Sequence, residues 1–400
     1  MSDIYTRLGV QRRINAAGTL TRLGGSLMEP EVLQAMAEAA AASVDIAQLQ
    51  AAASLVIAST TGAQAGIVTS GASAALTLAT AACLARWDVA RMSALPDARA
   101  MPNRVLMART HRNSYDHAVR VAGARIVDIG HNDRGTGAGV RGLEAWEITA
   151  AIDEHTAAFV FVATAQTAND LPLVLSTMHA HGLPVIVDAA AQLPPKSNLR
   201  LFIEAGADLV LFSGGKAIGG PQSTGILAGR RDLIGSALVQ MMDMDVSPQS
   251  WSPPDLIDRA ALKSVPYHGI GRGFKVGKEE IVGLLTALQR FVERDEDATA
   301  AQLTQRLQRI AAELATGSLF KTRLVSGGGA EAGASVPILE LTVGNTAPAL
   351  CRRLLSGDPP VHLGERLVDA GVVTINPQTL RPQDDAVLTR CLIEASRSQE

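Results

Sequence analysis

Aromatic residues and cysteines are scarce in this chain of 400 residues. Phe, Trp and Tyr together make up 3% of the sequence, so a core must be built mainly from aliphatic side chains that pack closely. The three cysteines, Cys83, Cys351 and Cys391, are too few and too far apart to form a disulfide framework or a zinc site. This cysteine usage fits a reducing compartment, and we expect a cytoplasmic protein without a structural metal.

Excess charge and long uninterrupted apolar runs are also lacking. The formal net charge is −3, which gives no electrostatic reason to expect a nucleic-acid or membrane partner. The N-terminus has no apolar signal-peptide core. The stretch 65–84 is weakly polar, but Thr-Ser-Gly-Ala-Ser at 69–73 interrupts it, which favours a strand, a turn and a helix over a membrane span.

The chain is long enough for two domains, since 47% of its residues are hydrophobic. From residue 65 onwards, apolar runs and helical patterns alternate. Strands are predicted at 67–69, 104–108, 125–129, 158–163, 185–188 and 208–213, with a final strand at 226–228 for which an antiparallel direction is one alternative. Helices are predicted at 31–59, 74–85, 115–122, 143–152 and 173–181. This order predicts an α/β fold with a mostly parallel sheet covered by helices.

The predicted domains are an irregular N-terminal arm (1–30), a large domain (31–285) and a smaller α+β domain (286–400). The arm contains Arg7, Arg12, Arg13 and Arg22. A helix at 279–293 is expected to lead into the small domain. The small domain is expected to contain helices at 300–315, at 347–355 and from 384, strands at 322–325, 336–343 and 372–375, and a loop around the three glycines 327–329.

Two of the predicted strands end in residues that suit pyridoxal phosphate. The first runs into Asp188, and the second runs into Ser213-Gly214-Gly215-Lys216. Ligands of open α/β sheets bind outside the carboxyl ends of the strands, so Asp188 and Lys216 should lie side by side. A lysine there can form a Schiff base with the cofactor aldehyde, and an aspartate can keep the pyridine nitrogen protonated. Taken singly, each residue also fits a turn or a solvated loop.

A phosphate site is predicted at Ser70-Gly71-Ala72-Ser73, between a strand and a helix. Small residues let the backbone approach a phosphate, and a helix N-terminus offers unpaired N–H groups and a positive dipole end. The hydroxyl of Ser213 could reach the same phosphate. A plain serine N-cap is the alternative.

Two other motifs fit the chain less well. Ser213 and Lys216 have the Ser-x-x-Lys spacing of penicillin-recognising enzymes, but the Ser-Asp-Asn and Lys-Thr-Gly partners of that motif are missing. Residues 137–142 match Gly-x-Gly-x-x-Gly, yet they begin well after the strand that ends near Ile129, so we predict a loop there and no dinucleotide site.

The polar stretch 110–117 follows another strand end. His111 could stack on the pyridine ring or donate a proton, whereas His117 falls inside the next helix. A solvated loop capped by Asn113 or Ser114 is the alternative. Gln192, four residues after Asp188, is a candidate hydrogen-bond partner for the hydroxyl of the cofactor ring.

Cations for an anionic substrate are predicted in a glycine-rich loop, where Arg272 and Lys275 are the candidates. Arg381 is a separate candidate for binding a carboxylate. Solvated surface charges are the alternative for all three.

These stretches resemble the L-seryl-tRNA(Sec) selenium transferase superfamily of fold-type I pyridoxal phosphate enzymes. The resemblance rests on Ser213–Gln222, with its Gly-Gly-Lys and Gly-Gly-Pro-Gln, and on 111–113, 187–190 and 272–280. It implies Lys216 as the lysine that holds the cofactor, Asp188 as the partner of the pyridine nitrogen, and active sites completed by a neighbouring subunit of a homodimer or higher homo-oligomer.

The chain departs from the transferase itself, since it lacks the extended N-terminal tRNA-binding domain and has Gly215 where an aspartate is usual. It is more similar to the short subgroup of D-glucosaminate-6-phosphate ammonia-lyases. We therefore expect α,β-elimination of a small, anionic hydroxy-amino acid to a 2-oxo acid and ammonia. Alternatives are a racemase, an aldolase or selenium transferase-like activity with the same cofactor, and a regulatory protein without catalysis.

Overall fold

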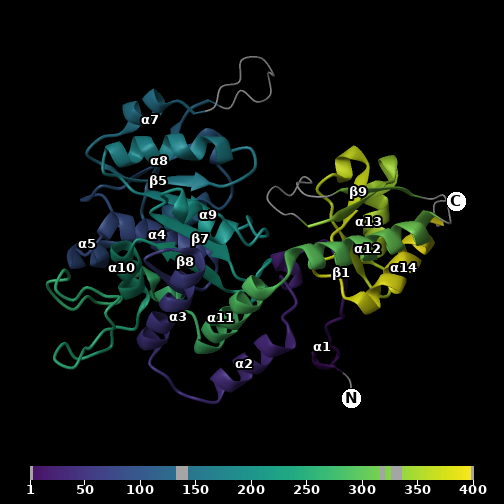
Figure 1. Ribbon diagram of the computed structural model, residues 1–400, viewed down its shortest axis with the longest axis horizontal. Coiled ribbons are helices and arrows are strands. Elements are labelled where there is room, and N and C mark those ends of the chain that lie inside the picture. Colours follow the sequence, from purple (N-terminus) through teal and green to yellow (C-terminus); the bar gives the residue numbers. More distant parts are fainter. Residues whose placement is uncertain (1–2, 132–142, 316–319, 326–335, 398–400) are drawn as a thin grey trace. The chain divides into compact units, whose positions relative to one another are not determined.

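The computed structural model describes residues 3–131, 143–315, 320–325 and 336–397. Its described residues form two compact units, one made of Met28–Val292 and the other of Met1–Leu27 together with Glu293–Glu400 (Figure 1). No described helix is both long and apolar enough to cross a membrane. The glycine-rich motif at 137–142 and the three glycines at 327–329 lie outside the described residues.

The larger unit is built on a seven-stranded sheet with the order β2-β8-β7-β6-β5-β3-β4. β8 runs antiparallel to both of its neighbours, and the other paired strands are parallel. The strands are β2 (Ala65–Thr69), β3 (Arg104–Ala108), β4 (Arg125–Ile129), β5 (Thr156–Val162), β6 (Val185–Asp188), β7 (Leu209–Ser213) and β8 (Gly225–Gly229). The predicted α/β class with a mostly parallel sheet is confirmed, as is the antiparallel alternative for the last strand.

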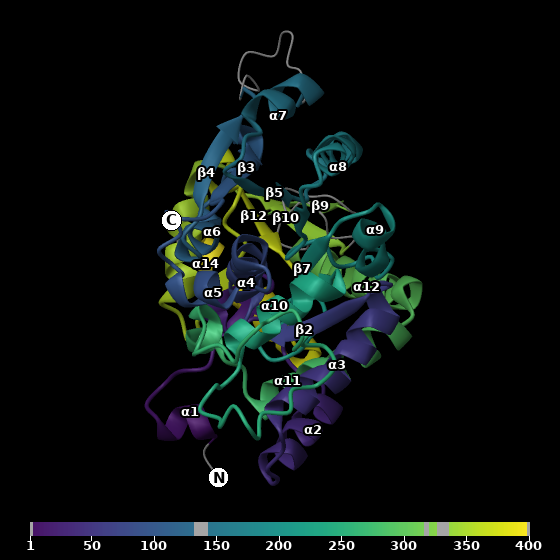
Figure 2. The same ribbon diagram turned by 90° about the vertical axis from the view of Figure 1, so that its left-hand side faces the viewer.

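Helices cover both faces of this sheet, as Figure 2 shows. One layer contains α4 (Ala72–Ala85), α5 (Val89–Ala94), α6 (Asp116–Val121) and α10 (Arg231–Met241). The other contains α3 (Ile46–Thr61), α7 (Ala145–Ala151), α8 (Leu171–Ala180) and α9 (Asn198–Glu204). Two further helices of the chain are α2 (Pro30–Ala40) and α11 (Lys278–Glu293).

The prediction of one long helix over 31–59 is wrong, because α2 and α3 are separate helices. The chain leaves the helical conformation between them, and the side chain of Asp45 accepts a hydrogen bond from the Gln48 N–H at 3.0 Å. This contact is an N-cap that starts α3. High helix propensity over the whole stretch conceals such a break.

Alanine-rich α4 is buried along nearly its whole length, from Ala74 to Ala85. Small side chains let it lie between the sheet on one side and α5, α6 and α10 on the other. This packing explains the low aromatic content, and it fixes the N-terminus of α4 at the carboxyl edge of the sheet.

The edge strand β2 forms hydrogen bonds with side chains of α3. The Gln50 amide donates to the Val68 carbonyl at 2.8 Å and accepts from the Val68 N–H at 2.9 Å. The Ser54 hydroxyl accepts from the Gly66 N–H at 3.0 Å. These side chains satisfy backbone groups that an edge strand would otherwise leave unpaired.

The smaller unit has a three-stranded antiparallel sheet with the order β12-β10-β9 and a parallel pair, β1 with β11. Its strands are β1 (Ile14–Ala16), β9 (Lys321–Val325), β10 (Ile338–Thr342), β11 (Val361–Leu363) and β12 (Val372–Ile375). Its helices are α1 (Ile4–Arg7), α12 (Glu296–Ala315), α13 (Ala347–Leu355) and α14 (Asp385–Arg397). The sequence predicts an irregular arm at 1–30, but residues up to Leu27 belong to this unit and contribute its strand β1.

We expect Gln50→Ala to destabilise the protein through strand β2. The substitution leaves the buried N–H and carbonyl groups of Val68 without partners, at about 1–3 kcal/mol each, so the free energy of unfolding should fall by about 2–6 kcal/mol. Urea unfolding measures this loss. Gln48→Ala, on the exposed face of the same helix, should change it by less than about 0.5 kcal/mol. Equal effects of the two substitutions would contradict the role of Gln50.

Candidate active site

The predicted cofactor residues follow strand ends that meet at one edge of the sheet. Thr69 at the end of β2 pairs with Gly225 at the start of β8, and Gly225 pairs on its other side with Ser213 at the end of β7. Asp188, the last residue of β6, pairs with Val162, the last residue of β5. The register therefore places the turn after β2, the Ser213 turn and Asp188 along one line.

The turn from β2 into α4 contains Ser70, Gly71, Ala72 and Ser73. Gly71 has φ 122°, a conformation that favours glycine, and it is the N-cap of α4 without a side-chain cap. A side chain on the neighbouring Gly225 would lie 2.6 Å from the Gly71 carbonyl carbon, so the two backbones approach closely. The first N–H groups of α4 have no acceptor within the helix and can bind an anion.

The turn that holds Lys216 depends on the two glycines before it. A Cβ atom on Gly214 would lie 2.1 Å from the Thr224 hydroxyl oxygen, and one on Gly215 would lie 2.6 Å from the Gln222 Cα. Gly215 therefore has no room for the aspartate that the selenium transferases usually have there. Lys216 is partly buried in this turn, directly after β7.

Asp188 and Lys216 lie close enough for their charges to interact. Burial of the carboxyl raises the pKa of Asp188 above its usual range, while the Ala190 N–H and the Lys216 ammonium act in the opposite direction. The Ala190 N–H donates to Asp188 Oδ1 at 3.0 Å. A carboxylate held away from water in this way interacts strongly with any cation placed beside it.

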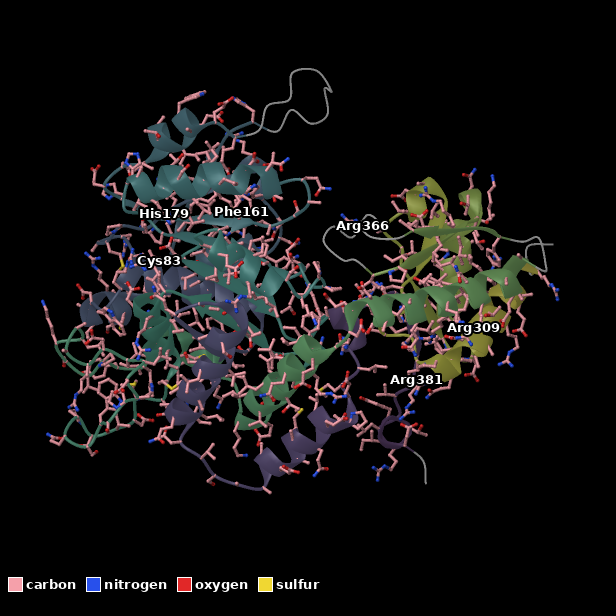
Figure 3. The ribbon with its side chains drawn as sticks, in the orientation of Figure 1. Cys83, Phe161, His179, Arg309, Arg366 and Arg381 are labelled. Carbon is pink, nitrogen blue, oxygen red and sulfur yellow. The ribbon has the colours of Figure 1, made fainter. Side chains whose placement is uncertain are left out.

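His111 ends a short 3₁₀ helix, Arg109–His111, directly after β3. Its side chain is 2% exposed and meets the Phe161 ring edge to face, with centroids 4.6 Å apart. The Val162 N–H donates to His111 Nδ1 at 3.4 Å, so the neutral ring carries its proton on Nε2. Phe161 lies on β5 within the sheet, as Figure 3 shows.

An ion-pair cluster that sequence reasoning missed fixes the loop after His111. Arg112 pairs with both Asp116 on α6 and Asp128 on β4, and Asp116 also accepts from the Asn113 N–H at 3.3 Å. Charged residues four apart at a helix start are a recognisable signal for the first pair, whereas the second joins residues 16 positions apart.

The remaining candidates have their own surroundings. Gln192 is 8% exposed, just after β6. Arg272 lies in a 3₁₀ helix, Ile270–Phe274. Its Nη2 is 2.9 Å from a carboxylate oxygen of Asp243. Lys275, which follows this helix, is exposed. Arg381 belongs to the smaller unit, where Figure 3 labels it, and donates from Nε and Nη2 to Asp384 at 2.7 and 2.9 Å.

Neither the two buried cysteines nor a cavity in the larger unit competes with this edge. Burial raises the pKa of Cys83 to about 12 and that of Cys351 to about 11, so neither is a thiolate nucleophile near neutral pH. A cavity of about 690 Å³ opens where Gln64 precedes β2 and Arg231 follows β8, at the amino edge of the sheet. None of the residues predicted for the cofactor lines it.

The mostly parallel seven-stranded sheet with the smaller antiparallel sheet is the fold of the fold-type I pyridoxal phosphate enzymes. The full chain superposes on a solved structure of D-glucosaminate-6-phosphate ammonia-lyase with a TM-score of 0.80 at 29% identity, covering 100% of this chain and 99% of that one. A NifS-like protein, at 15% identity and a TM-score of 0.54, shares the fold.

The chain belongs to the aminotransferase class-V family, whose model matches residues 34–315. Members of this family use pyridoxal phosphate. The chain is 31% identical to the D-glucosaminate-6-phosphate ammonia lyase of Salmonella typhimurium, over 98% of this chain and 97% of the relative. It is also 30% identical to a 5'-C-glycyluridine monooxygenase-decarboxylase from a Streptomyces species, over 98% of this chain and 91% of the relative.

We expect Asp188→Asn to alter how the stability of the cofactor-free protein depends on pH. Folding raises the pKa of Asp188, so its ionisation disfavours the folded chain, and this cost grows as the pH rises above about 3.9. The asparagine variant should therefore gain stability relative to the wild type between pH 4 and pH 7. Urea unfolding at both pH values tests this, and a difference that does not change with pH would contradict it.

Proposed function

We propose that this chain binds pyridoxal phosphate at the carboxyl edge of the large sheet. The observation that supports this most directly is the strand register, which pairs Asp188 at the end of β6 with Leu211 of β7, the strand that leads into the turn holding Lys216. The residues fit the cofactor: Lys216 would hold it covalently, Asp188 would accept a hydrogen bond from the pyridine nitrogen, and the N-terminus of α4 with Ser70–Ser73 would bind its phosphate. Ser213 would add a hydroxyl to the phosphate site, because only Gly225 of β8 lies between Ser213 and the end of β2 in the strand pairing. Gln192 would contact the hydroxyl of the cofactor ring.

The reaction that we propose is α,β-elimination of a hydroxy-amino acid to a 2-oxo acid and ammonia. When bound, the cofactor supplies an electron sink for a carbanion at the substrate Cα. Once the substrate amine has taken its place on the cofactor, Lys216 Nζ would take the Cα proton, and Asp188 would keep the ring nitrogen protonated. The Cβ hydroxyl leaves as water with a proton from His111 Nε2, and the released enamine reacts with water to give the 2-oxo acid and ammonia.

The substrate in this proposal is a small amino acid with a distal anion, such as an amino-sugar acid phosphate. Arg272 and Lys275 would bind the distal anion, and Arg381 is assigned to a carboxylate. Arg272 and Arg381 each have a carboxylate partner in the chain, Asp243 and Asp384, so a substrate anion would exchange with these partners. The working form is expected to be a homodimer or a higher homo-oligomer.

The two full-length relatives differ in chemistry at almost the same identity, so the reaction type needs a direct test. The ammonia lyase supports elimination. A panel of hydroxy-amino acids, with and without a distal phosphate, should yield ammonia and a 2-oxo acid in equal amounts with no uptake of oxygen. Elimination would be contradicted by an inverted amino acid, by an aldehyde, or by carbon dioxide with oxygen consumption. Each of these products would indicate another reaction of the same cofactor.

We expect Arg272→Ala to weaken kcat/KM for a substrate with a distal anion by roughly ten- to a hundred-fold, because a charge-assisted hydrogen bond contributes about 1.5–3 kcal/mol. An uncharged analogue should respond little, and cofactor loading should stay unchanged. Arg259→Ala is the matched control, since Arg259 is exposed and its guanidinium donates to the Trp251 carbonyl at 2.9 Å. Loss of cofactor in Arg272→Ala would assign Arg272 to the cofactor phosphate, and no effect on either substrate would refute the anionic substrate.

A further inference from the structure

The cavity at the amino edge of the large sheet is separate from the proposed active site. Its volume of about 690 Å³ lies within the range of about 300–1,000 Å³ that is typical of small-molecule sites. The N-terminus of α4 is the proposed phosphate site, and Trp87, two residues after the end of α4, lines the cavity. The 14 residues of α4 separate the two places by roughly 20 Å. A molecule in the cavity would therefore not contact the proposed cofactor.

The apolar wall of the cavity is built where Trp87 and Leu256 meet α10. A Cβ atom on Gly235 of α10 would lie 2.6 Å from Trp87 Cη2 and 2.2 Å from the Leu256 carbonyl oxygen. Glycine at this position lets the indole ring and the 252–259 loop pack directly on the helix. Leu256 is buried, while Trp87 keeps part of its surface accessible. An indole ring supported in this way suits an apolar or aromatic group of a ligand.

The backbone before Trp87 is held in an unusual conformation. Arg86, the C-cap of α4, has φ 53° and ψ −126°, which residues other than glycine rarely adopt. Two contacts with α10 hold it, since its carbonyl accepts a hydrogen bond from the Ser236 hydroxyl and its Nη1 lies 3.8 Å from a carboxylate oxygen of Asp232. Such conformations gather at ligand and catalytic sites, and here it sets the direction of Trp87.

Charged groups of opposite sign line the same cavity without pairing with each other. Arg231 Nη2 donates to the backbone carbonyl of Asp255 at 2.9 Å, and no carboxylate of the described residues forms an ion pair with Arg231. The Asp255 carboxylate has no cationic partner in the described part of the chain either. Asp258, three residues further on, accepts a hydrogen bond from the Ala261 N–H at 3.0 Å. One guanidinium and two carboxylates are therefore available to a ligand.

Two other charged residues of the cavity wall already have partners. Asp232 accepts from Arg230 Nε and Nη2 at 3.0 and 2.7 Å. Arg259 donates from both Nη atoms to the Trp251 and Pro248 carbonyls, and its guanidinium lies 5.8 Å from the centroid of the Trp251 ring. We assign neither residue to the ligand.

We propose that this cavity binds a zwitterionic amino acid with an apolar or aromatic side chain. Arg231 binds its carboxylate, Asp255 and Asp258 bind its ammonium group, and Trp87 contacts its side chain. The hydrogen bond between Arg231 and the Asp255 carbonyl places the cation and the first carboxylate on adjoining residues, as the two charged groups of one amino acid require. The site does not depend on the proposed elimination, because none of these residues is assigned a part in it.

The test uses the intact holoenzyme labelled with 5-fluorotryptophan and ¹⁹F NMR. The chain has three tryptophans, and Trp87→Phe identifies the Trp87 signal. Titration with L-phenylalanine and with L-leucine should shift this signal saturably, while the signal of exposed Trp146 on α7 stays in place. Arg231→Gln and Asp255→Asn should each weaken binding by about tenfold or more, because each removes a charge-assisted hydrogen bond.

Arg91→Gln is the matched control, because Arg91 is close to Trp87 in the sequence but lies 3.6 Å from a carboxylate oxygen of Asp88 and does not line the cavity. It should bind as the wild type does. Phenethylamine lacks the carboxylate and 3-phenylpropanoate lacks the ammonium group, so both should bind at least tenfold more weakly than L-phenylalanine. A Trp87 signal that neither amino acid shifts, equal affinity for either analogue, or equal binding by Arg231→Gln and Arg91→Gln would overturn the proposal.

Discussion

The interaction on which the site depends is that of a carboxylate held away from water with a cation beside it. Burial alone makes the charged form of Asp188 unfavourable, and the chain offsets this only in part, with the Ala190 N–H and the Lys216 ammonium. A protonated pyridine ring would complete the compensation. Without the ring, burial destabilises the charge of the Asp188 carboxylate. With the ring present, the same burial would strengthen the attraction between carboxylate and pyridinium, because the local dielectric is low.

The rest of the larger unit serves to bring this pair to the correct place. Parallel pairing aligns the ends of β5, β6 and β7, and antiparallel β8 brings Gly225 between the ends of β2 and β7. Close contacts then require glycine at three positions, with the Thr224 side chain at Gly214 and with neighbouring backbone at Gly215 and Gly225. Buried α4, with its small side chains, points its N-terminus at the same edge. The candidate site is therefore positioned by strand register and by residues that have no side chain.

Much of this could be predicted from the sequence, because the signals are local. Apolar runs that end in Asp188 and in Ser213–Lys216 indicate parallel strands, and general rules of α/β folds place both ends at one edge. The break between α2 and α3, the pairing of β1 with β11 and the Arg112–Asp128 ion pair could not be predicted. The first is hidden by high helix propensity, and the other two join residues far apart in sequence, which one sequence without relatives does not connect.

The relatives narrow the chemistry to a family while leaving the reaction open, since an ammonia lyase and a monooxygenase-decarboxylase are equally similar to the chain. The central claim is therefore the one about the cofactor and its lysine. Borohydride reduction of the purified protein, followed by peptide mass spectrometry, tests it most directly. The account predicts that the reduced cofactor is attached to Lys216 and that Lys216→Ala carries no such adduct. An adduct on another lysine, or none in a fully loaded protein, would contradict it.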